Sequence, residues 1–246
     1  RPPGGALGTS GPHVSAVRSG AELCTSEAQL RDYDARKPGY PLDRRTLAGD
    51  ASKVEEPLAR YSFAVGRFDD DEGGDLLAQR RLEQSRTASR TYQWEVSFPV
   101  RAGMRIRLRE HPQDDANGDF LVVAARTEVN PARKTRKHIA EVVPASVPWR
   151  PEVLPKPRIQ GHQTAFVAGA PGKEIDVDAE GRIAVRFHWD TRKEGVSRRV
   201  RVATPWMGTN RGFWTLPRVG DEVVVAYLDG DPDQPLVVGS VNNAVA

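Results

Sequence analysis

Hydrophobic and polar residues alternate along the chain in several short segments. In the segment TYQWEVSFPV the apolar residues all share one parity: Tyr92, Trp94, Val96, Phe98 and Val100. Successive side chains of a strand point to opposite faces of a sheet. The segment is therefore predicted to be a strand with one buried face and one solvated face.

A β-hairpin is predicted directly after this strand. Ile106 and Leu108 alternate with arginines, and the polar turn QDDANGD then leads into the apolar run FLVVAA. Asn-Gly is a favoured turn pair because both residues tolerate a positive φ. The two apolar runs should thus lie antiparallel in one sheet.

One helix is predicted in the first half of the chain, in the segment GGDLLAQRRLEQSRTASR. Carboxylates of residues 69–75 lie at or before its start, where they oppose the positive end of the helix dipole. An apolar stripe along it comprises Leu76, Leu77, Ala78 and Leu82.

The acidic run DDDEGGD also suggests a calcium loop, but this alternative fails on spacing. An EF-hand loop that began at Asp69 would need an oxygen ligand at its fifth position and a glutamate at its twelfth. Gly73 and Arg80 occupy those positions. Helix capping is the better interpretation of the run.

Short β-strands dominate the last third of the chain. Ile183, Val185, Phe187 and Trp189 alternate after a polar turn that follows Ile175 and Val177, and His188 falls on the parity expected to face solvent or a neighbour. Further strands are predicted in TAFVAG, RRVRVATPW, DEVVVAYL and PLVVGSV. About five short strands suit a small closed barrel, because closure removes exposed sheet edges.

Prolines separate the two halves. Five of them fall within residues 144–157, where they fix φ and remove backbone donors, so this stretch should be extended and stiff. The sequence predicts four segments: a flexible or extended segment over 1–20, a β domain with one helix over 21–143, a linker over 144–159 and a five-stranded barrel over 160–246.

Three aspartates in five residues, Asp229, Asp231 and Asp233, suggest either a metal or acid–base site or a bend between two strands. Gly230 supplies a residue free to adopt a positive φ, and aspartate side chains accept hydrogen bonds from nearby amides. No histidine follows at close spacing. A turn is therefore the preferred interpretation, with no cofactor and no metal expected.

Composition narrows the function classes. The 246 residues carry 36 basic and 33 acidic side chains, a net charge of +3, which does not favour a dedicated nucleic-acid binder. The most basic stretch, residues 126–137, is predicted to be a solvated loop, with a phosphate or partner patch as the alternative. No apolar run reaches the length of a membrane span, so no stable membrane anchor is expected. The single cysteine, Cys24, excludes an intrachain disulfide.

The segment PRVGDEVVVAYLDGDPDQPLVVGSVNN resembles the signature of VgrG, the spike protein of type VI secretion systems, which is related to the hub and spike of contractile phage tails. Further similarity covers WRPEVLPKPRIQGHQ and FHWD. The residues that carry the signature are Pro217, Arg218, Gly220, Glu222, Gly230, Asp231, Pro232, Asp233, Pro235, Gly239 and Asn242.

The resemblance implies a mainly β protein: a hub-type β-barrel region with one helix, followed by an OB-fold neck. It implies a homotrimer that caps the tail tube and punctures target membranes while it delivers effectors, with an Hcp-like ring protein and a PAAR-like tip protein as partners. It also implies assembly in the bacterial cytoplasm before injection. Trp206, Phe213 and Trp214 are candidate interface residues, and a place in the core at the end of the barrel is the equal alternative.

Two other function classes are weaker. An OB fold can bind oligosaccharide or single-stranded nucleic acid. Such a face would use Arg182, Arg186, Trp189, Arg199 and Arg201. An enzyme is not expected, because no metalloprotease motif, nucleophile elbow or phosphate loop is present.

Overall fold

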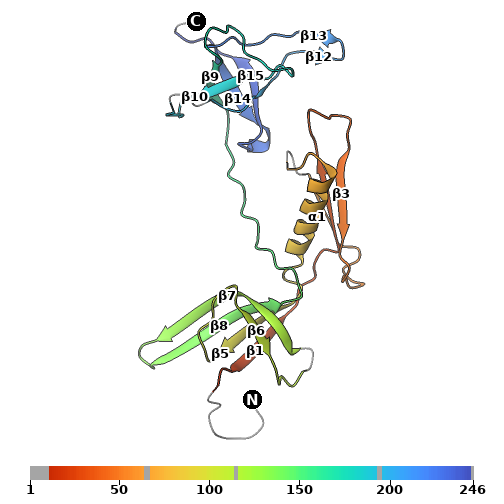
Figure 1. Cartoon of the computed structure of the whole chain (residues 1–246), viewed down its shortest axis with the longest axis vertical. Coiled ribbons are helices and arrows are strands. Elements are labelled where there is room, and N and C mark those ends of the chain that lie inside the picture. Colours follow the sequence, from red (N-terminus) through yellow and green to blue (C-terminus); the bar gives the residue numbers. More distant parts are fainter. Residues whose placement is uncertain (1–10, 64–66, 114–115, 193–195, 245–246) are drawn as a thin grey trace. The chain divides into compact units, whose positions relative to one another are not determined.

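The computed structural model describes residues 11–63, 67–113, 116–192 and 196–244. The chain divides into two compact units, Arg1–Val153 and Leu154–Ala246 (Figure 1). Strands predominate in both units, and the described residues contain one α-helix. The prediction of a mainly β protein with a single helix is confirmed.

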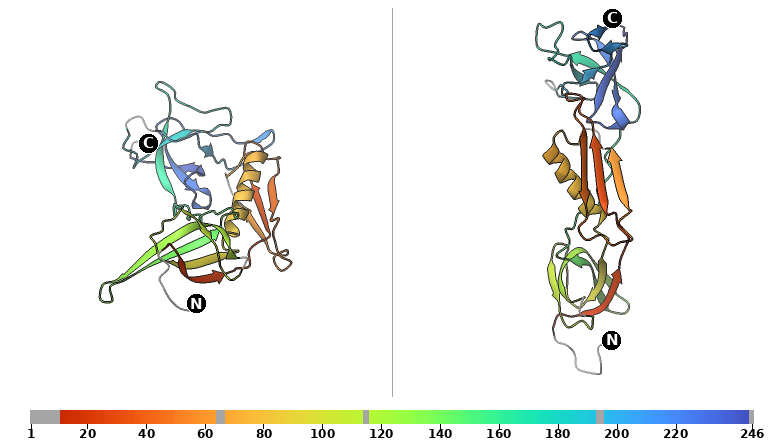
Figure 2. Two further views of the ribbon diagram at one scale, coloured as in Figure 1. Left: turned by 60° about the horizontal axis from the view of Figure 1, so that its bottom comes forward. Right: turned by 90° about the vertical axis from the view of Figure 1, so that its right-hand side faces the viewer.

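A five-stranded antiparallel sheet forms the larger part of the first unit. Its strand order is β1-β5-β8-β7-β6, and it curls strongly (Figure 2). The strands are β1 (Val14–Gly20), β5 (Thr91–Val96), β6 (Arg105–Leu108), β7 (Gly118–Asn130) and β8 (Thr135–Pro144). The alternation predicted for β5 is confirmed, because Trp94 and Val96 are buried in a cluster with Phe120, Val122 and Val142. The predicted β6–β7 hairpin is also present.

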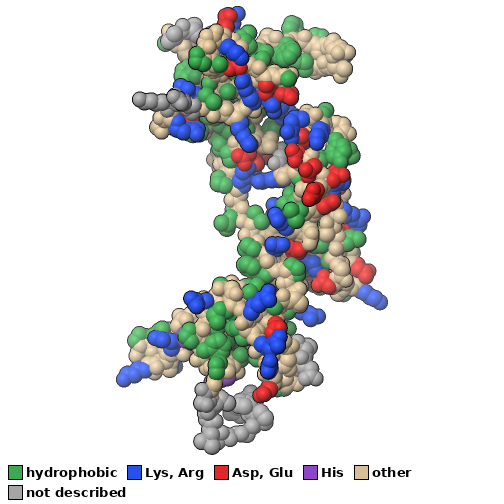
Figure 3. Space-filling view, in the orientation of Figure 1, with side chains coloured by type: hydrophobic (Ala, Val, Ile, Leu, Met, Phe, Trp, Pro, Cys, Tyr) green, Lys and Arg blue, Asp and Glu red, His purple; other side chains and the backbone are tan. Residues whose placement is uncertain are grey.

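One expectation for this sheet was incomplete and another was wrong. A flexible or extended segment was predicted over residues 1–20; Val14–Gly20 is extended, but it also forms β1, which pairs with β5 with a register shift between Val14 and Ala16. Residues 1–10 lie outside the described part of the chain. The basic stretch at 126–137 is not a loop but the outer part of the β7–β8 hairpin, held by ladder bonds from Arg126↔Ile139 to Asn130↔Thr135. Figure 3 shows Lys and Arg side chains toward the outer end of the β7–β8 hairpin.

A smaller sheet with the order β3-β2-β4 completes the first unit. Its strands are β2 (Glu27–Asp32), β3 (Leu42–Leu47) and β4 (Ala59–Phe63). Helix α1 (Asp71–Ser85) covers one face, where Leu30, Leu42, Phe68 and Ala78 form a buried cluster (Figure 1).

The predicted helix is confirmed, and its start is capped by a carboxylate. Asp70 is the N-cap, and its Oδ1 accepts a hydrogen bond of 2.7 Å from the amide of Gly73. The expected apolar stripe was partly wrong, since Leu76 is exposed and Gly74 is buried. A Cβ at Gly74 would lie 2.7 Å from Arg44 Cγ of β3 and 2.7 Å from the Phe68 ring, so the helix approaches its sheet through a glycine.

The second unit is a five-stranded barrel with the sheet order β10-β9-β14-β15-β11. Its strands are β9 (Gln163–Ala168), β10 (Ala184–Phe187), β11 (Arg201–Val202), β14 (Glu222–Tyr227) and β15 (Pro235–Ser240). A bridge between Ile183 and Val200 joins the two end strands and closes the barrel. A short hairpin of β12 (Met207–Gly208) and β13 (Arg211–Gly212) lies in the connection before β14.

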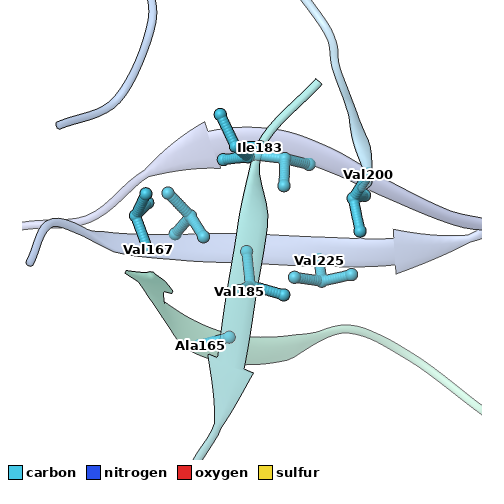
Figure 4. Close-up of a cluster of buried hydrophobic side chains, with 8 residues drawn as sticks. Ala165, Val167, Ile183, Val185, Val200 and Val225 are labelled. Carbon is cyan, nitrogen blue, oxygen red and sulfur yellow. The ribbon is translucent and has the colours of Figure 1, made fainter. Parts of the chain in front are cut away.

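Valine fills most of the barrel core. The buried side chains point toward one another from different strands (Figure 4): Ala165, Val167, Ile183, Val185, Val200, Val223, Val225 and Val237. The predicted alternation covers Ile183, Val185 and Val200 of this set, and the other members lie in the apolar runs that were predicted as strands. Ile175 and Trp189 were expected to face inward, but both are exposed, because they lie beyond the paired parts of their strands.

Candidate functional site

The signature residues begin with a tight turn that leads into β14. The amide of Arg218 donates to Asp221 Oδ2 at 2.7 Å, and the amide of Asp221 returns a bond to the Arg218 carbonyl at 3.0 Å. Gly220 has a φ of +98°, which favours glycine. Its amide donates to the Val167 carbonyl at 3.0 Å. The turn therefore attaches the start of β14 to β9.

Glu222, the first residue of β14, anchors the chain that follows β15. Asn243 Nδ2 donates to Glu222 Oε2 at 3.1 Å, and the amide of Val241 donates to the Glu222 carbonyl at 3.0 Å. Hydrogen bonds from Asn243 and Thr164 lower the pKa of the Glu222 carboxyl. His188 Nε2 lies 3.6 Å from this carboxylate, and the imidazole is about half exposed, on the parity expected from the sequence.

The aspartate-rich segment between β14 and β15 folds as a turn. Asp229 and Gly230 both have a positive φ, 51° and 72°. The Leu228 amide donates to the Gln234 carbonyl at 3.0 Å, and the Asp231 amide donates to the Leu228 carbonyl at 2.9 Å. These bonds reverse the chain as turn chemistry requires.

Two of these aspartates bind a lysine from the start of the second unit. Lys156 Nζ forms ion pairs with Asp231 and with Asp233, the latter at 2.5 Å. The amide of Ile159 also donates to the Gly230 carbonyl at 2.8 Å. No group of three or more His, Cys, Asp or Glu side chains in the described part of the chain is placed to hold a metal ion.

The remaining signature residues lie at and beyond β15. Pro235 begins the strand, Pro232 is exposed in the preceding turn, and Asn242 is exposed after the strand ends. Gly239 pairs with Val224 beside a β-bulge. Neither its φ nor crowding requires glycine there, since an added Cβ would meet no atom within 4 Å.

The candidate interface residues are all on the surface. Trp206, Phe213 and Trp214 are 53%, 62% and 64% exposed, and Met207 beside them is 57% exposed. Trp206 and Phe213 meet edge to face, with ring centroids 5.9 Å apart. Trp214 lies against Gly181, where an added Cβ would be 2.9 Å from its ring. We call Trp206, Met207, Phe213 and Trp214, in and beside the β12–β13 hairpin, the aromatic hairpin. None of them belongs to the buried core of the barrel.

The basic residues proposed for an OB-type binding face are partly neutralised. Arg182 pairs with Asp178 at 2.7 Å and with Glu180 at 3.0 Å. Arg199 pairs with the buried carboxylate of Asp176 at 3.0 Å. Two of the four arginines thus serve the barrel itself, which does not favour a cationic groove for nucleic acid.

Sequence reasoning missed Lys156 and Asp176. Their partners are far along the chain: Lys156 and Asp231 are 75 residues apart, and Asp176 and Arg199 are 23 apart. Periodicity carries no signal for such pairs. Only the position of Lys156 between two prolines, in a stretch expected to be extended, marks it as unusual.

Family comparisons agree with the two-part architecture. Residues 1–132 match the model of the phage tail baseplate hub (GPD), and residues 172–241 match that of the type VI secretion system/phage-baseplate injector OB domain. In addition, none of the described helices is long and apolar enough to cross a membrane.

Named relatives point the same way. The actin cross-linking toxin VgrG1 of Vibrio cholerae is 34% identical over 98% of this chain and 23% of its own length. The type VI secretion system spike protein VgrG4b of Pseudomonas aeruginosa is 35% identical over 89% of this chain and 30% of its own length. The chain thus spans less than a third of the length of either relative.

A solved structure supports the fold alone. A chain of the half-lidded Francisella PdpA–VgrG complex superposes with a TM-score of 0.57 at 5% identity, over 94% of this chain and 43% of that one. The family-model matches cover hub and OB regions, and the relatives at about one-third identity are named VgrG. The chain belongs to the phage tail baseplate hub family, and its relatives at about one-third identity are VgrG-type spike proteins of type VI secretion systems.

Proposed function

We propose that this chain is the part of a type VI secretion spike that joins hub and neck, and that it assembles as a homotrimer capping the tail tube. In this proposal residues 21–143 belong to the hub, residues 144–159 are the linker and residues 160–246 are the OB-fold neck. The role is structural and not enzymatic. The trimer punctures target membranes and delivers effectors when the contractile apparatus fires.

The aromatic hairpin is the observation that carries the trimer proposal. Three aromatic side chains that directly precede or follow the β12–β13 hairpin are each more than half exposed, and they form an apolar surface of the kind that marks an interface. Burial of apolar surface stabilises by about 25 cal/mol per Å². A closed symmetric ring would cover the hairpin of every copy at once.

The partners follow from family membership and remain part of the proposal. An Hcp-like ring protein would contact the hub side, and a PAAR-like tip protein with its effectors would follow in the full-length spike. The chain would assemble in the bacterial cytoplasm and leave the cell through the apparatus. The balanced charge of the chain fits this role better than nucleic-acid binding.

Solution mass tests the proposal. Light scattering of the wild-type chain at micromolar concentrations is expected to give three times the chain mass. Trp206→Ala with Phe213→Ala should shift the species to monomer. Trp189→Ala is the matched control, because Trp189 is 65% exposed but stacks on Phe187 outside the hairpin. A monomer for the wild type, or the same mass for the hairpin variant as for the control, would contradict the proposal.

A further inference from the structure

The proline-rich stretch between the two units is fastened at its first end. Arg150 Nε forms an ion pair with Glu83 Oε2 at 2.7 Å, and Thr87 Oγ1 donates to the Arg150 carbonyl at 3.2 Å. Gln84 Nε2 donates to the Pro151 carbonyl at 3.1 Å. These contacts, all within the first unit, attach residues 150–151 to the last turns of α1 and the residues after it.

The other end is fastened to the barrel. Lys156 forms ion pairs with Asp231 and Asp233, and the side chains of Lys156 and Asp231 are 27% and 17% exposed. The Ile159 amide donates to the Gly230 carbonyl. Gly230 approaches so closely that an added Cβ would lie 2.9 Å from the Ile159 carbonyl oxygen.

Four residues remain between these two attachments. Residues 152–155 are all exposed, Leu154 by 83%, and none of them makes a hydrogen bond or an ion pair in the described part of the chain. Pro155 fixes its own φ and restricts Leu154 to extended conformations. The segment is a short, stiff connection that no hydrogen bond or ion pair holds in place among the described residues.

We propose that residues 152–155 are the joint between the two units, and that Lys156 with Asp231 and Asp233 forms a clasp that sets the length of this joint. The aspartates of the signature turn then have a role beyond the bend itself. Four residues span at most about 13–14 Å, whereas release of Lys156 would free residues 152–158, which span about 23–25 Å. If the chain is part of a spike, as proposed above, a short joint would transmit force from one unit to the other. The clasp itself does not depend on that proposed function.

Trypsin reports directly on the clasp. Proline follows both Arg150 and Lys156, so Arg158–Ile159 is the cleavable bond of the linker, and its amide is the one held by Gly230. Both ion pairs are partly exposed to solvent, the Asp233 side chain by 74%, so each contributes only modestly to closure. Loss of both should therefore speed cleavage at this bond about five- to tenfold in Asp231→Asn/Asp233→Asn and in Lys156→Met.

Asp229→Asn is the matched control, because Asp229 lies in the same turn, carries the same charge and makes no hydrogen bond or ion pair with the linker in the described part of the chain. It should be cut at the wild-type rate. Hydrogen exchange supplies a second measurement: the Ile159 amide should lose protection in the clasp variants, while the Val167 and Val185 amides keep theirs and show an intact barrel.

Equal cleavage and exchange rates in the clasp variants and the wild type would overturn the clasp, as would equal acceleration in the control. The outcome is separable from the mass experiment. A trimer with an unprotected Ile159 amide would contradict the clasp alone, and a monomer with a protected amide would contradict the proposed assembly alone.

Discussion

The barrel of the second unit and the helix-covered sheet of the first unit hold their cores together in different ways. The barrel buries eight small apolar side chains, six of them valine, from strands that enclose them on all sides. The sheet beneath α1 buries a cluster of only four. Stiff β-branched side chains suit a closed β core.

Hydrogen bonds and an ion pair of buried polar groups add stability to the region with the smaller core. The Asp32 carboxylate accepts hydrogen bonds from the amides of Arg67 and Phe68 at 2.7 and 3.0 Å, which attaches the entry of α1 to β2. At the other end of the helix, Arg86 donates to Glu55 at 3.4 Å. Both side chains of this pair are nearly fully buried.

This difference between the two cores explains why one of them is easier to predict from the sequence than the other. A core made by alternating valines leaves a period of two in the sequence. A region held by single carboxylates that accept backbone bonds leaves no period. The two regions should therefore respond to different substitutions.

The largest effect is expected at the bridge that closes the barrel. Ile183→Ala removes a fully buried side chain and should cost about 2–5 kcal/mol of unfolding free energy in the second unit. This loss of unfolding free energy is measured by urea unfolding, with the exchange of barrel amides as the signal. Ile175→Ala is the control, since Ile175 is about half exposed. Similar losses for both variants would mean that the barrel does not depend on close packing.

A smaller effect is expected where a glycine allows close approach. A Cβ at Gly169 would lie 2.5 Å from Val219 Cγ2 and 2.9 Å from Asp176 Cβ. Gly169→Ala should therefore cost about 1–3 kcal/mol through overpacking. Thermal unfolding compares Gly169→Ala with Gly239→Ala. The Cβ added at residue 239 would meet no atom within 4 Å, so that substitution should be nearly neutral. The reverse order of the two variants would contradict the packing described for the barrel.

The sharpest test of the polar region concerns Glu55, and it is measured as a dependence on pH. Hydrogen bonds from the backbone of Ser52 and Cys24 lower the pKa of the Glu55 carboxyl from 4.5 to about 2. Because the folded pKa is depressed, the carboxylate stabilises the fold above pH 4.5, and this contribution is lost as the pH falls toward 2.

Glu55→Gln should therefore flatten the pH dependence of first-unit stability between pH 4.5 and 2, measured by urea midpoints at each pH. Glu56→Gln, an exposed neighbour, should leave the profile as in the wild type. A profile unchanged by Glu55→Gln would show that this carboxylate does not anchor the helix region.

Much of the fold could be predicted from the sequence where one face of a strand is buried. Trp94 and Val96, or Ile183 and Val185, indicate their strands by the alternation of apolar and polar residues. The strand at Val14–Gly20 was missed because most of its side chains are exposed on both faces. Leu76 was misplaced because the helix meets its sheet at Gly74, and a glycine contributes nothing to an apolar stripe.

The candidate site was predictable in part. The turn at residues 228–234 follows from its Asp, Gly and Pro residues, whose local hydrogen bonds need no distant partner. Its attachment to Lys156 was not predictable, because that contact exists only once the barrel has brought the segments together. The exposure of the aromatic hairpin could not be predicted either, because the alternation along a strand gives no information about residues outside the sheet.

An image of the assembled contractile particle, with the wild-type chain labelled, tests the spike assignment most directly. We expect the label at the end of the tail tube, on a component with threefold symmetry. A label along the sheath, or particles whose tube ends lack this chain, would contradict it.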